Sequence, residues 1–130
     1  RTLQGLNECD FGDWTGRRLR DLSKLKSWST VQKQPSNFRF PNGESFTEMQ
    51  NRMIRTIDKL VERHSGGTVI CVSHADPIKA ILASAVGTPL DLFQRIVIGP
   101  CSASVVIYTK ERPLVLSLNS NGNFSGSLGS

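Results

Sequence analysis

Apolar residues recur at helical spacing over residues 46–61 and predict one long amphipathic helix. Just before this stretch, Ser45 and Glu48 have the spacing of a capping box, in which each side chain accepts a hydrogen bond from the other residue's backbone N–H. The helix is expected to run to about His64 and to end at Gly66-Gly67. It is the longest element that the hydrophobic pattern predicts.

A short apolar and β-branched run, Thr68–Ser73, follows and is typical of a fully buried strand. Asp76-Pro77 then indicates a second helix, because an aspartate can cap a helix and proline suits its first position. This helix is expected over Pro77–Val86, with Gly87 at its end. His74 lies between strand and helix, where α/β proteins bind ligands and a helix N-terminus favours anions. The pattern therefore predicts a histidine that acts on a phosphate.

The N-terminal part of the chain is expected to contain two loops and one short helix. The glycines and acidic residues of Leu6–Gly16 favour an ordered loop that Phe11 and Trp14 anchor to a core. A second, polar loop over Pro35–Pro41 ends in the turn signal Asn42-Gly43. Between the loops, apolar residues at helical spacing predict a single amphipathic helix: Leu19, Leu22, Leu25, Trp28 and Val31.

The C-terminal part is predicted to form a hairpin and a loose tail. After a helical turn at Pro89–Phe93, Ser102–Tyr108 and Leu114–Leu118 alternate in polarity and predict two strands at a sheet edge. We expect one domain over residues 1–118, whose order of helices and strands indicates an α/β layered protein. Residues 119–130 are rich in Gly, Ser and Asn and have too little apolar surface to fold, so a flexible tail is expected.

Charge and composition restrict the partners. The net charge of +5 over 130 residues suggests an anionic partner. Because Lys and Arg are spread along the chain without an aromatic stacking platform, a solvated basic surface is favoured over nucleic-acid binding. A small phosphorylated substrate needs no more positive charge than this. No apolar run reaches the roughly 18 residues of a membrane helix, and no signal-peptide pattern begins the sequence, so no membrane partner is expected.

Cysteine usage indicates the compartment. Cys9, Cys71 and Cys101 are an odd number without CxxC spacing. They indicate reduced thiols in a cytoplasmic protein rather than a disulfide framework or a zinc site. Cys71 is expected to point into the core from its strand. No second histidine or base nearby in the sequence suggests a serine or cysteine nucleophile.

Two side chains are candidates for catalysis. His74 is one because of its place before a helix, whereas His64 lies at a helix C-terminus that suits a partly protonated imidazole, and no chemistry is assigned to it. Glu8 is the other, because Leu6 and Phe11 flank it and could desolvate it. Desolvation would raise the pKa of its carboxyl toward neutrality, as a general acid requires. The alternatives are a structural histidine and a surface glutamate, and composition alone favours the surface glutamate.

Three segments together resemble motifs of the histidine phosphatase superfamily, the phosphoglycerate mutase-like proteins. Leu6–Gly16 resembles the pattern L-x-E-x-x-F-G-x-W-x-G, and Pro41–Ser45 resembles P-x-G-E-S before a long helix, with Arg52 at the expected later place. Gly67–His74 resembles the second-histidine motif of the family. The three motifs occur in the family's order. The resemblance implies a three-layer α/β/α fold with a mainly parallel sheet.

The resemblance also implies a mechanism without a metal or other cofactor. In the family, a first histidine in an Arg-His-Gly motif takes up the phosphoryl group, while arginines and a second histidine bind its oxygens. By matching motifs, His74 is similar to that second histidine and Glu8 to the family's acid/base. Ser73 and the backbone N–H of Ala75 would join the phosphate cradle. Ala75 and Asp76 stand where the family more often has glycines, and Asp76 could disfavour very anionic substrates.

One motif of the family has no match in these residues. Nothing matches Arg-His-Gly, and the sequence begins at Arg1 rather than Met. The chain therefore resembles the C-terminal part of a histidine phosphatase whose sheet is incomplete at the N-terminus. Because a buried parallel strand needs neighbours on both sides, we expect the chain alone to expose a sheet edge. An N-terminal segment, or another copy of the chain, would complete the sheet.

Several functions remain open at this point. Hydrolysis of a small phosphomonoester through a phosphohistidine is the first hypothesis. A mutase, in which the phosphoenzyme returns its phosphoryl group to a bound product, is the near alternative. A catalytically inactive regulatory remnant is a hypothesis of a different class, and a basic nucleic-acid module is a distant third.

Overall fold

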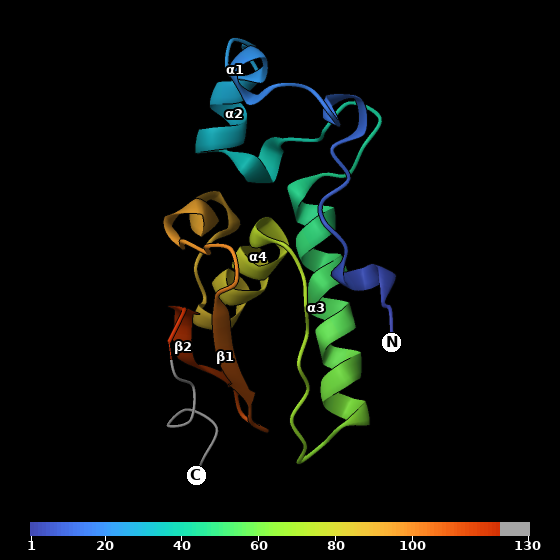
Figure 1. The fold of residues 1–130 in the computed structure, drawn as a ribbon, viewed down its shortest axis with the longest axis vertical. Coiled ribbons are helices and arrows are strands. Elements are labelled where there is room, and N and C mark those ends of the chain that lie inside the picture. Colours follow the sequence, from blue (N-terminus) through green and yellow to red (C-terminus); the bar gives the residue numbers. More distant parts are fainter. Residues whose placement is uncertain (123–130) are drawn as a thin grey trace.

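The computed structural model describes residues 1–122, and Figure 1 shows their arrangement. A long helix, α3, lies beside a shorter one, α4, and a two-stranded hairpin packs on the other side of α4. The α-helices and strands are α1 (Leu19–Leu22), α2 (Trp28–Lys33), α3 (Phe46–Arg63), α4 (Ala75–Val86), β1 (Ala103–Tyr108) and β2 (Pro113–Ser120). Short 3₁₀ helices are η1 (Gln4–Leu6), η2 (Gly12–Trp14), η3 (Pro35–Asn37) and η4 (Leu90–Arg95).

Helix α3 confirms the prediction from its capping box. The Ser45 hydroxyl accepts a hydrogen bond from the Glu48 N–H at 3.1 Å, and the Glu48 carboxylate accepts one from the Ser45 N–H at 3.0 Å. His64 occupies the C-cap position. The helix buries Phe46 and two methionines, so its apolar stripe forms one wall of the core.

Helix α4 begins two residues earlier than the sequence suggested. His74, not Asp76, is its N-cap, and the His74 carbonyl accepts the first helical hydrogen bond, from the Ile78 N–H, at 3.1 Å. Pro77 fits in the first turn because its missing N–H is one of the donors that a helix start leaves without an internal partner. The predicted end is confirmed, since Gly87 adopts a left-handed conformation at the C-cap.

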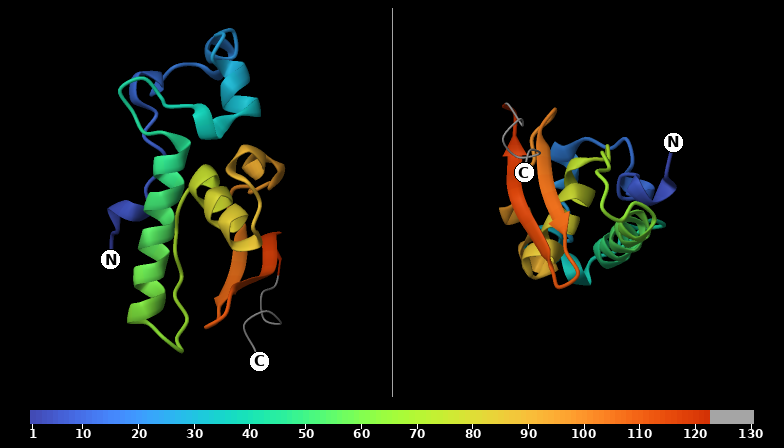
Figure 2. Two further views of the ribbon diagram at one scale, coloured as in Figure 1. Left: turned by 180° about the vertical axis from the view of Figure 1, so that it is seen from behind. Right: turned by 90° about the horizontal axis from the view of Figure 1, so that it is seen from below.

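The expected buried strand at Thr68–Ser73 is wrong for the described residues. The segment belongs to no sheet, and the exposed fractions of Ile70 and Val72 are 89% and 84%. Cys71 is likewise exposed rather than in the core. A strand needs a hydrogen-bonded neighbour, and no strand within residues 1–122 pairs with this segment. Figures 1 and 2 show it as a single extended stretch between α3 and α4.

The sheet of residues 1–122 is the antiparallel pair β1 and β2, which confirms the predicted hairpin. A mainly parallel sheet and three layers stay predictions, since this part of the chain contains neither. Asn119 and Ser120, expected in the tail, belong to β2 instead. The Asn119 side chain accepts a hydrogen bond from the Gly99 N–H at 2.7 Å, which fixes the end of the strand. The rest of the predicted tail, from residue 123, lies outside the described residues.

The single helix predicted from Leu19 onward is two helices, α1 and α2. The break follows Leu22, where the Ser23 hydroxyl donates a hydrogen bond to the Arg20 carbonyl at 2.9 Å. A serine that bonds the preceding turn in this way competes with continued helix formation. Apolar spacing alone does not register that competition.

An aromatic cluster joins the N-terminal loop to the helices. Its rings contact one another at centroid distances of 5.0 to 5.5 Å, and its members are Phe11, Trp14, Phe38, Phe40, Phe46 and Phe93. Trp14 is buried, as its predicted anchoring role requires. The cluster therefore holds the loop that carries Glu8 against α3 and η4.

None of the helices in residues 1–122 combines the length and the apolar character needed to cross a membrane.

Candidate active site

The loop that carries Glu8 is held against the turn before α3 by close backbone contact. The Asp10 carbonyl accepts from the Glu44 N–H at 2.9 Å, and the Pro41 carbonyl accepts from the Asp13 N–H at 2.8 Å. Gly12 has a φ of 52°, and a Cβ at Gly12 or Gly43 would overlap backbone of the opposite segment. Only glycine fits both positions, which explains why the two motifs each carry one.

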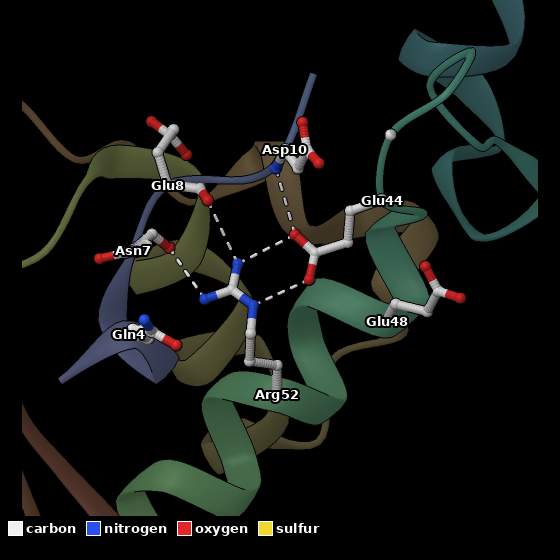
Figure 3. Close-up of a pocket in the computed structure, with 8 residues that line it drawn as sticks. Gln4, Asn7, Glu8, Asp10, Glu44, Glu48 and Arg52 are labelled. Carbon is white, nitrogen blue, oxygen red and sulfur yellow. Dashed lines mark hydrogen bonds and ion pairs between the residues drawn. The ribbon is translucent and has the colours of Figure 1, made fainter. Parts of the chain in front are cut away.

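Arg52 of α3 binds this loop through its guanidinium group. Its guanidinium donates to both carboxylate oxygens of Glu44, from Nε at 2.8 Å and from Nη2 at 2.9 Å. It also donates to the backbone carbonyls of Gly5, Asn7 and Glu8, at 2.9, 3.0 and 3.3 Å. Figure 3 shows the bonds of Arg52 to Asn7, Glu8 and Glu44. The hydrogen bond with Glu44 raises the pKa of Arg52. Arg52 therefore positions the loop with all three of its guanidinium nitrogens in use.

Glu8 and His74 lie side by side although they are far apart in the sequence. His74 Nδ1 is 3.9 Å from Glu8 Oε2. At this distance the two form an ion pair when the imidazole is protonated, and the contact is too long for a hydrogen bond. The exposed fractions of the side chains are 55% for His74 and 34% for Glu8. Both side chains are therefore accessible to solvent.

The environment of Glu8 raises the pKa of its carboxyl. Partial burial is the main cause, and the charge of Asp76 acts in the same direction. The hydrogen bond from the Cys9 N–H to Oε1, at 2.9 Å, and the charges of His74 and Arg52 lower the pKa and only partly offset the rise. The direction is the one that a general acid requires near neutral pH.

Ser73 and Ala75 flank His74 and differ in whether their hydrogen-bond donors already have an acceptor. The Ser73 hydroxyl donates to the Leu6 carbonyl at 2.6 Å and so ties the His74 segment to the Glu8 loop. Ala75 is the first residue of α4, where backbone N–H groups have no helical acceptor and the helix dipole is positive. Ala75 can therefore donate to an anion, whereas the proton of the Ser73 hydroxyl is already engaged.

Asp76 belongs to a polar network that the sequence did not indicate. Gln94 of η4 donates from Nε2 to Asp76 Oδ1 at 3.2 Å and accepts at Oε1 from Lys79 Nζ at 2.9 Å. Lys79 Nζ also lies 3.7 Å from the Asp76 carboxylate. The side chains of Asp76 and Lys79 are 23% and 15% exposed, respectively. The network fixes the first turn of α4 beside the Glu8–His74 pair.

An acidic hollow of about 470 Å³ lies beside the Glu8 loop. Figure 3 shows the Glu8 carboxylate pointing away from the Arg52 guanidinium. The hollow is lined by Gln4, Asn7, Glu8, Asp10, Gly43, Glu44, Glu48 and Arg52. Because its carboxylates outnumber its single arginine, which is already paired, the hollow does not suit a phosphate. The arrangement around His74 is the better candidate.

The sequence indicated Glu8 and His74 but gave no role to several residues that hold them. Arg52 was expected only at its place in the motif, and nothing suggested that it binds the Glu8 loop. Lys79 and Gln94 carry no sequence signal. His64 is the C-cap residue of α3, whereas Arg52 lies in the N-terminal half of that helix. Within residues 1–122, no three His, Cys, Asp or Glu side chains gather as ligands of a metal ion.

Comparison with known proteins identifies curated relatives of this chain. Phosphoserine phosphatase 1 of Hydrogenobacter thermophilus is 27% identical over 114 residues, which are 86% of this chain and 54% of the relative. "Probable phosphoglycerate mutase GpmB" of Yersinia pestis is 34% identical over 117 residues, which are 86% of this chain and 53% of that protein. The chain therefore spans about half the length of the curated relatives it matches.

Solved structures agree on the fold. YhfR of Bacillus stearothermophilus superposes with a TM-score of 0.83 at 23% sequence identity, over 91% of this chain and 60% of that one. The family model of the histidine phosphatase superfamily (branch 1) matches residues 1–121. Because this match covers almost the entire sequence, the chain belongs to the histidine phosphatase superfamily.

Proposed function

We propose that this chain provides the acid/base and one phosphate-binding histidine of a phosphomonoesterase that works through a phosphohistidine. The single observation that carries the proposal is the Glu8–His74 pair, whose facing atoms are 3.9 Å apart at the N-terminus of α4. The carboxyl is shifted toward the protonated form by burial. A proton donor beside a phosphate-binding position is what cleavage of an alkyl phosphate needs.

The first half of the reaction forms the phosphoenzyme. A histidine nitrogen outside these 130 residues attacks phosphorus, and the bond between phosphorus and the alkoxide oxygen breaks. Glu8 gives its proton to that oxygen, so the product leaves as a neutral alcohol. His74 and the Ala75 N–H hold the equatorial phosphoryl oxygens, where negative charge must be stabilised in the transition state.

The second half regenerates the enzyme. Glu8, now a carboxylate, takes a proton from water, and the water oxygen attacks phosphorus while the phosphorus–nitrogen bond breaks. Inorganic phosphate leaves, and the nucleophilic histidine is free again. The proton that Glu8 gave to the alcohol is thus replaced by one from water, and both residues return to their starting states.

The nucleophile would come from a further segment, which also completes the sheet. Another copy of the chain would complete the sheet without supplying this histidine, because these residues contain no Arg-His-Gly motif. The exposed segment at residues 68–73 supports this proposal, because its backbone is extended and two of its apolar side chains, Ile70 and Val72, face solvent. An added strand would pair with the backbone of this segment, and its own side chains would flank Ile70 and Val72 on the face of the sheet. His74 directly follows the segment, so the added strand would bring its own end close to the site.

Hydrolysis of p-nitrophenyl phosphate tests the proposal. The 130-residue chain is assayed alone and together with an upstream segment that carries Arg-His-Gly, with a segment carrying Arg-Ala-Gly as the matched control. We expect turnover with the Arg-His-Gly segment and none with the control. Turnover by the 130 residues alone would contradict the assignment of the nucleophile, and no turnover in any combination would favour an inactive remnant.

A mutase is the second candidate. The relative named as a phosphoglycerate mutase is 34% identical, which favours return of the phosphoryl group to a bound product. The two reactions share the first half and differ in what attacks the phosphoenzyme. Incubation of the active combination with a radiolabelled phosphoglycerate separates them, because hydrolysis releases labelled inorganic phosphate and a mutase yields the isomer.

A further inference from the structure

Asp76 is fixed in the first turn of α4, two residues after His74 and near enough to Glu8 for its charge to raise the pKa of that carboxyl. Its carboxylate accepts a hydrogen bond from Gln94 and lies 3.7 Å from Lys79, and its side chain is only 23% exposed. Gln94 lies on η4, next to Phe93, which is fully buried and packs on Phe46. The carboxylate is therefore held by two elements of the fold and cannot turn freely away from an approaching anion.

Lys79, beside this carboxylate, and Arg52, which binds the Glu8 loop, are both already engaged. Lys79 donates to Gln94 and lies against Asp76 itself, and Arg52 is bound to Glu44 and to backbone carbonyls. A second anionic group on a substrate would thus meet the Asp76 carboxylate beside cations that already have partners. Like charges brought together in a partly buried site repel strongly, because water screens them less there than in bulk.

We propose that Asp76 is a specificity-determining residue that admits phosphomonoesters with a neutral or cationic organic part and disfavours those with a second phosphate or a carboxylate. The proposal rests on the proposed function and names its substrate class. It also distinguishes the two candidate reactions. A phosphoenzyme that returns its phosphoryl group to a phosphorylated product makes a bisphosphate in the pocket, and Asp76 opposes that species. Hydrolysis makes no such intermediate.

A substrate series with a common primary-alcohol leaving group tests the proposal in the active combination. The series is phosphoethanolamine, glycerol 1-phosphate, 3-phosphoglycerate and 1,3-propanediol bisphosphate. We expect kcat/KM to fall in that order. Asp76→Asn keeps an oxygen for Gln94 but removes the charge, and it should raise the kcat/KM ratio of bisphosphate to glycerol phosphate by about tenfold, the factor that corresponds to 1.36 kcal/mol. An unchanged ratio would overturn the proposal.

A matched control removes the same charge elsewhere. Asp58 is exposed on the far half of α3, so Asp58→Asn should leave the ratio unchanged. If Asp58→Asn shifts the ratio as much as Asp76→Asn does, a general change in net charge explains the effect and the filter at Asp76 is rejected.

A binding measurement separates failure of this proposal from failure of the proposed function. Inorganic phosphate and pyrophosphate are titrated against the same protein while the imidazole resonances of His74 are followed by NMR. Asp76→Asn should strengthen binding of pyrophosphate more than binding of phosphate, whether or not any substrate is turned over. Equal effects on both anions would overturn the charge filter even where phosphatase activity is present.

Discussion

Arg52 and Glu44 form a bidentate ion pair directly beneath the backbone of the Glu8 loop, with nitrogen–oxygen distances of 2.8 and 2.9 Å. The side chains are only 21% and 15% exposed. The same guanidinium reaches three backbone carbonyls, among them that of Glu8. The pair thus connects the longest helix to the proposed general acid.

Arg52→Lys should destabilise the protein although it keeps the charge. A lysine ammonium cannot make the paired bonds to Glu44 and still reach the carbonyls of the loop. We expect the free energy of unfolding to fall by about 1–3 kcal/mol, the range for breaking a partly buried, charge-assisted hydrogen-bond network. Urea unfolding followed by tryptophan fluorescence measures the change, because Trp14 lies in the adjoining aromatic cluster.

Arg39→Lys is the control for that experiment. Arg39 and Glu48 also form a two-bond pair, at 2.7 and 2.6 Å, but both side chains are more than half exposed. Exposed pairs contribute little to stability because water competes for both groups. If Arg39→Lys lowers the free energy of unfolding as much as Arg52→Lys does, the bonds of Arg52 to the Glu8 loop do not explain the loss of stability.

Glu8→Gln should slow the cleavage of alkyl phosphates far more than that of p-nitrophenyl phosphate. An alkoxide needs the proton that Glu8 gives, whereas p-nitrophenolate leaves without one. Loss of a general acid typically reduces the rate by about 10²–10⁴-fold. Single-turnover formation of the phosphoenzyme from each substrate measures the effect. Equal slowing of both substrates would show that Glu8 does not act as the acid.

The raised pKa of Glu8 also predicts how stability changes with pH. Burial raises the pKa in the folded state above the ordinary value of 4.5, so the folded state holds this proton more tightly than the unfolded chain does. The contribution to stability is complete below the unfolded pKa and is lost as the pH rises through the folded pKa. Glu8→Gln should therefore flatten the fall of stability above pH 4.5, as thermal unfolding at a series of pH values would reveal. A steeper fall in the variant would contradict this.

Gly43→Ala should separate the Glu8 loop from the turn before α3. The added Cβ would overlap the Asp10 carbonyl, so one of the two backbones must move. Overpacking of this kind costs about 1–3 kcal/mol of stability. Gly122→Ala is the matched control, because its Cβ meets nothing within 4 Å. Calorimetry should show a lower Tm for Gly43→Ala alone, and equal Tm values would rule out the close contact.

Replacing Ile70 and Val72 together by lysine should leave the 130-residue chain folded, since these side chains are 89% and 84% exposed. The same change should abolish activation by an Arg-His-Gly segment, because two charges would lie where an added strand packs. Val97→Lys, at a 67% exposed residue outside this segment, is the control. Unimpaired activation of the double variant would show that the added segment binds elsewhere.

Local patterns predicted the helices well because their signals lie within a few residues. The Ser45–Glu48 capping box and Gly87 define helix ends through bonds that span a single turn. The predicted start of α4 was two residues too late, because aspartate is a common N-cap residue and Asp76 was assigned that position. Its carboxylate is instead bound by Gln94, 18 residues later in the chain, and spacing gives no sign of that bond.

The predicted strand at residues 68–73 illustrates a different limit. Its composition favours burial in a sheet, but pairing needs a neighbouring strand, and no strand in residues 1–122 pairs with it. The site was predicted only in outline for a similar reason. Motifs indicated Glu8 and His74, whereas their closeness depends on Arg52 and Ser73 binding backbone carbonyls. Backbone acceptors are the same in every residue, so no sequence pattern reveals them.

The hydrogen bond from the Ser73 hydroxyl to the Leu6 carbonyl depends on the side chain at position 73 but not on the side chain at position 6. Every amino acid has a backbone carbonyl, so exchanges of the Leu6 side chain leave the acceptor in place. At position 73 only a side chain with a short donor can make the bond. Mutation of Leu6 therefore leaves this hydrogen bond in place, whereas alanine at position 73, with a methyl in place of the hydroxymethyl group, removes the bond that holds the His74 segment to the Glu8 loop.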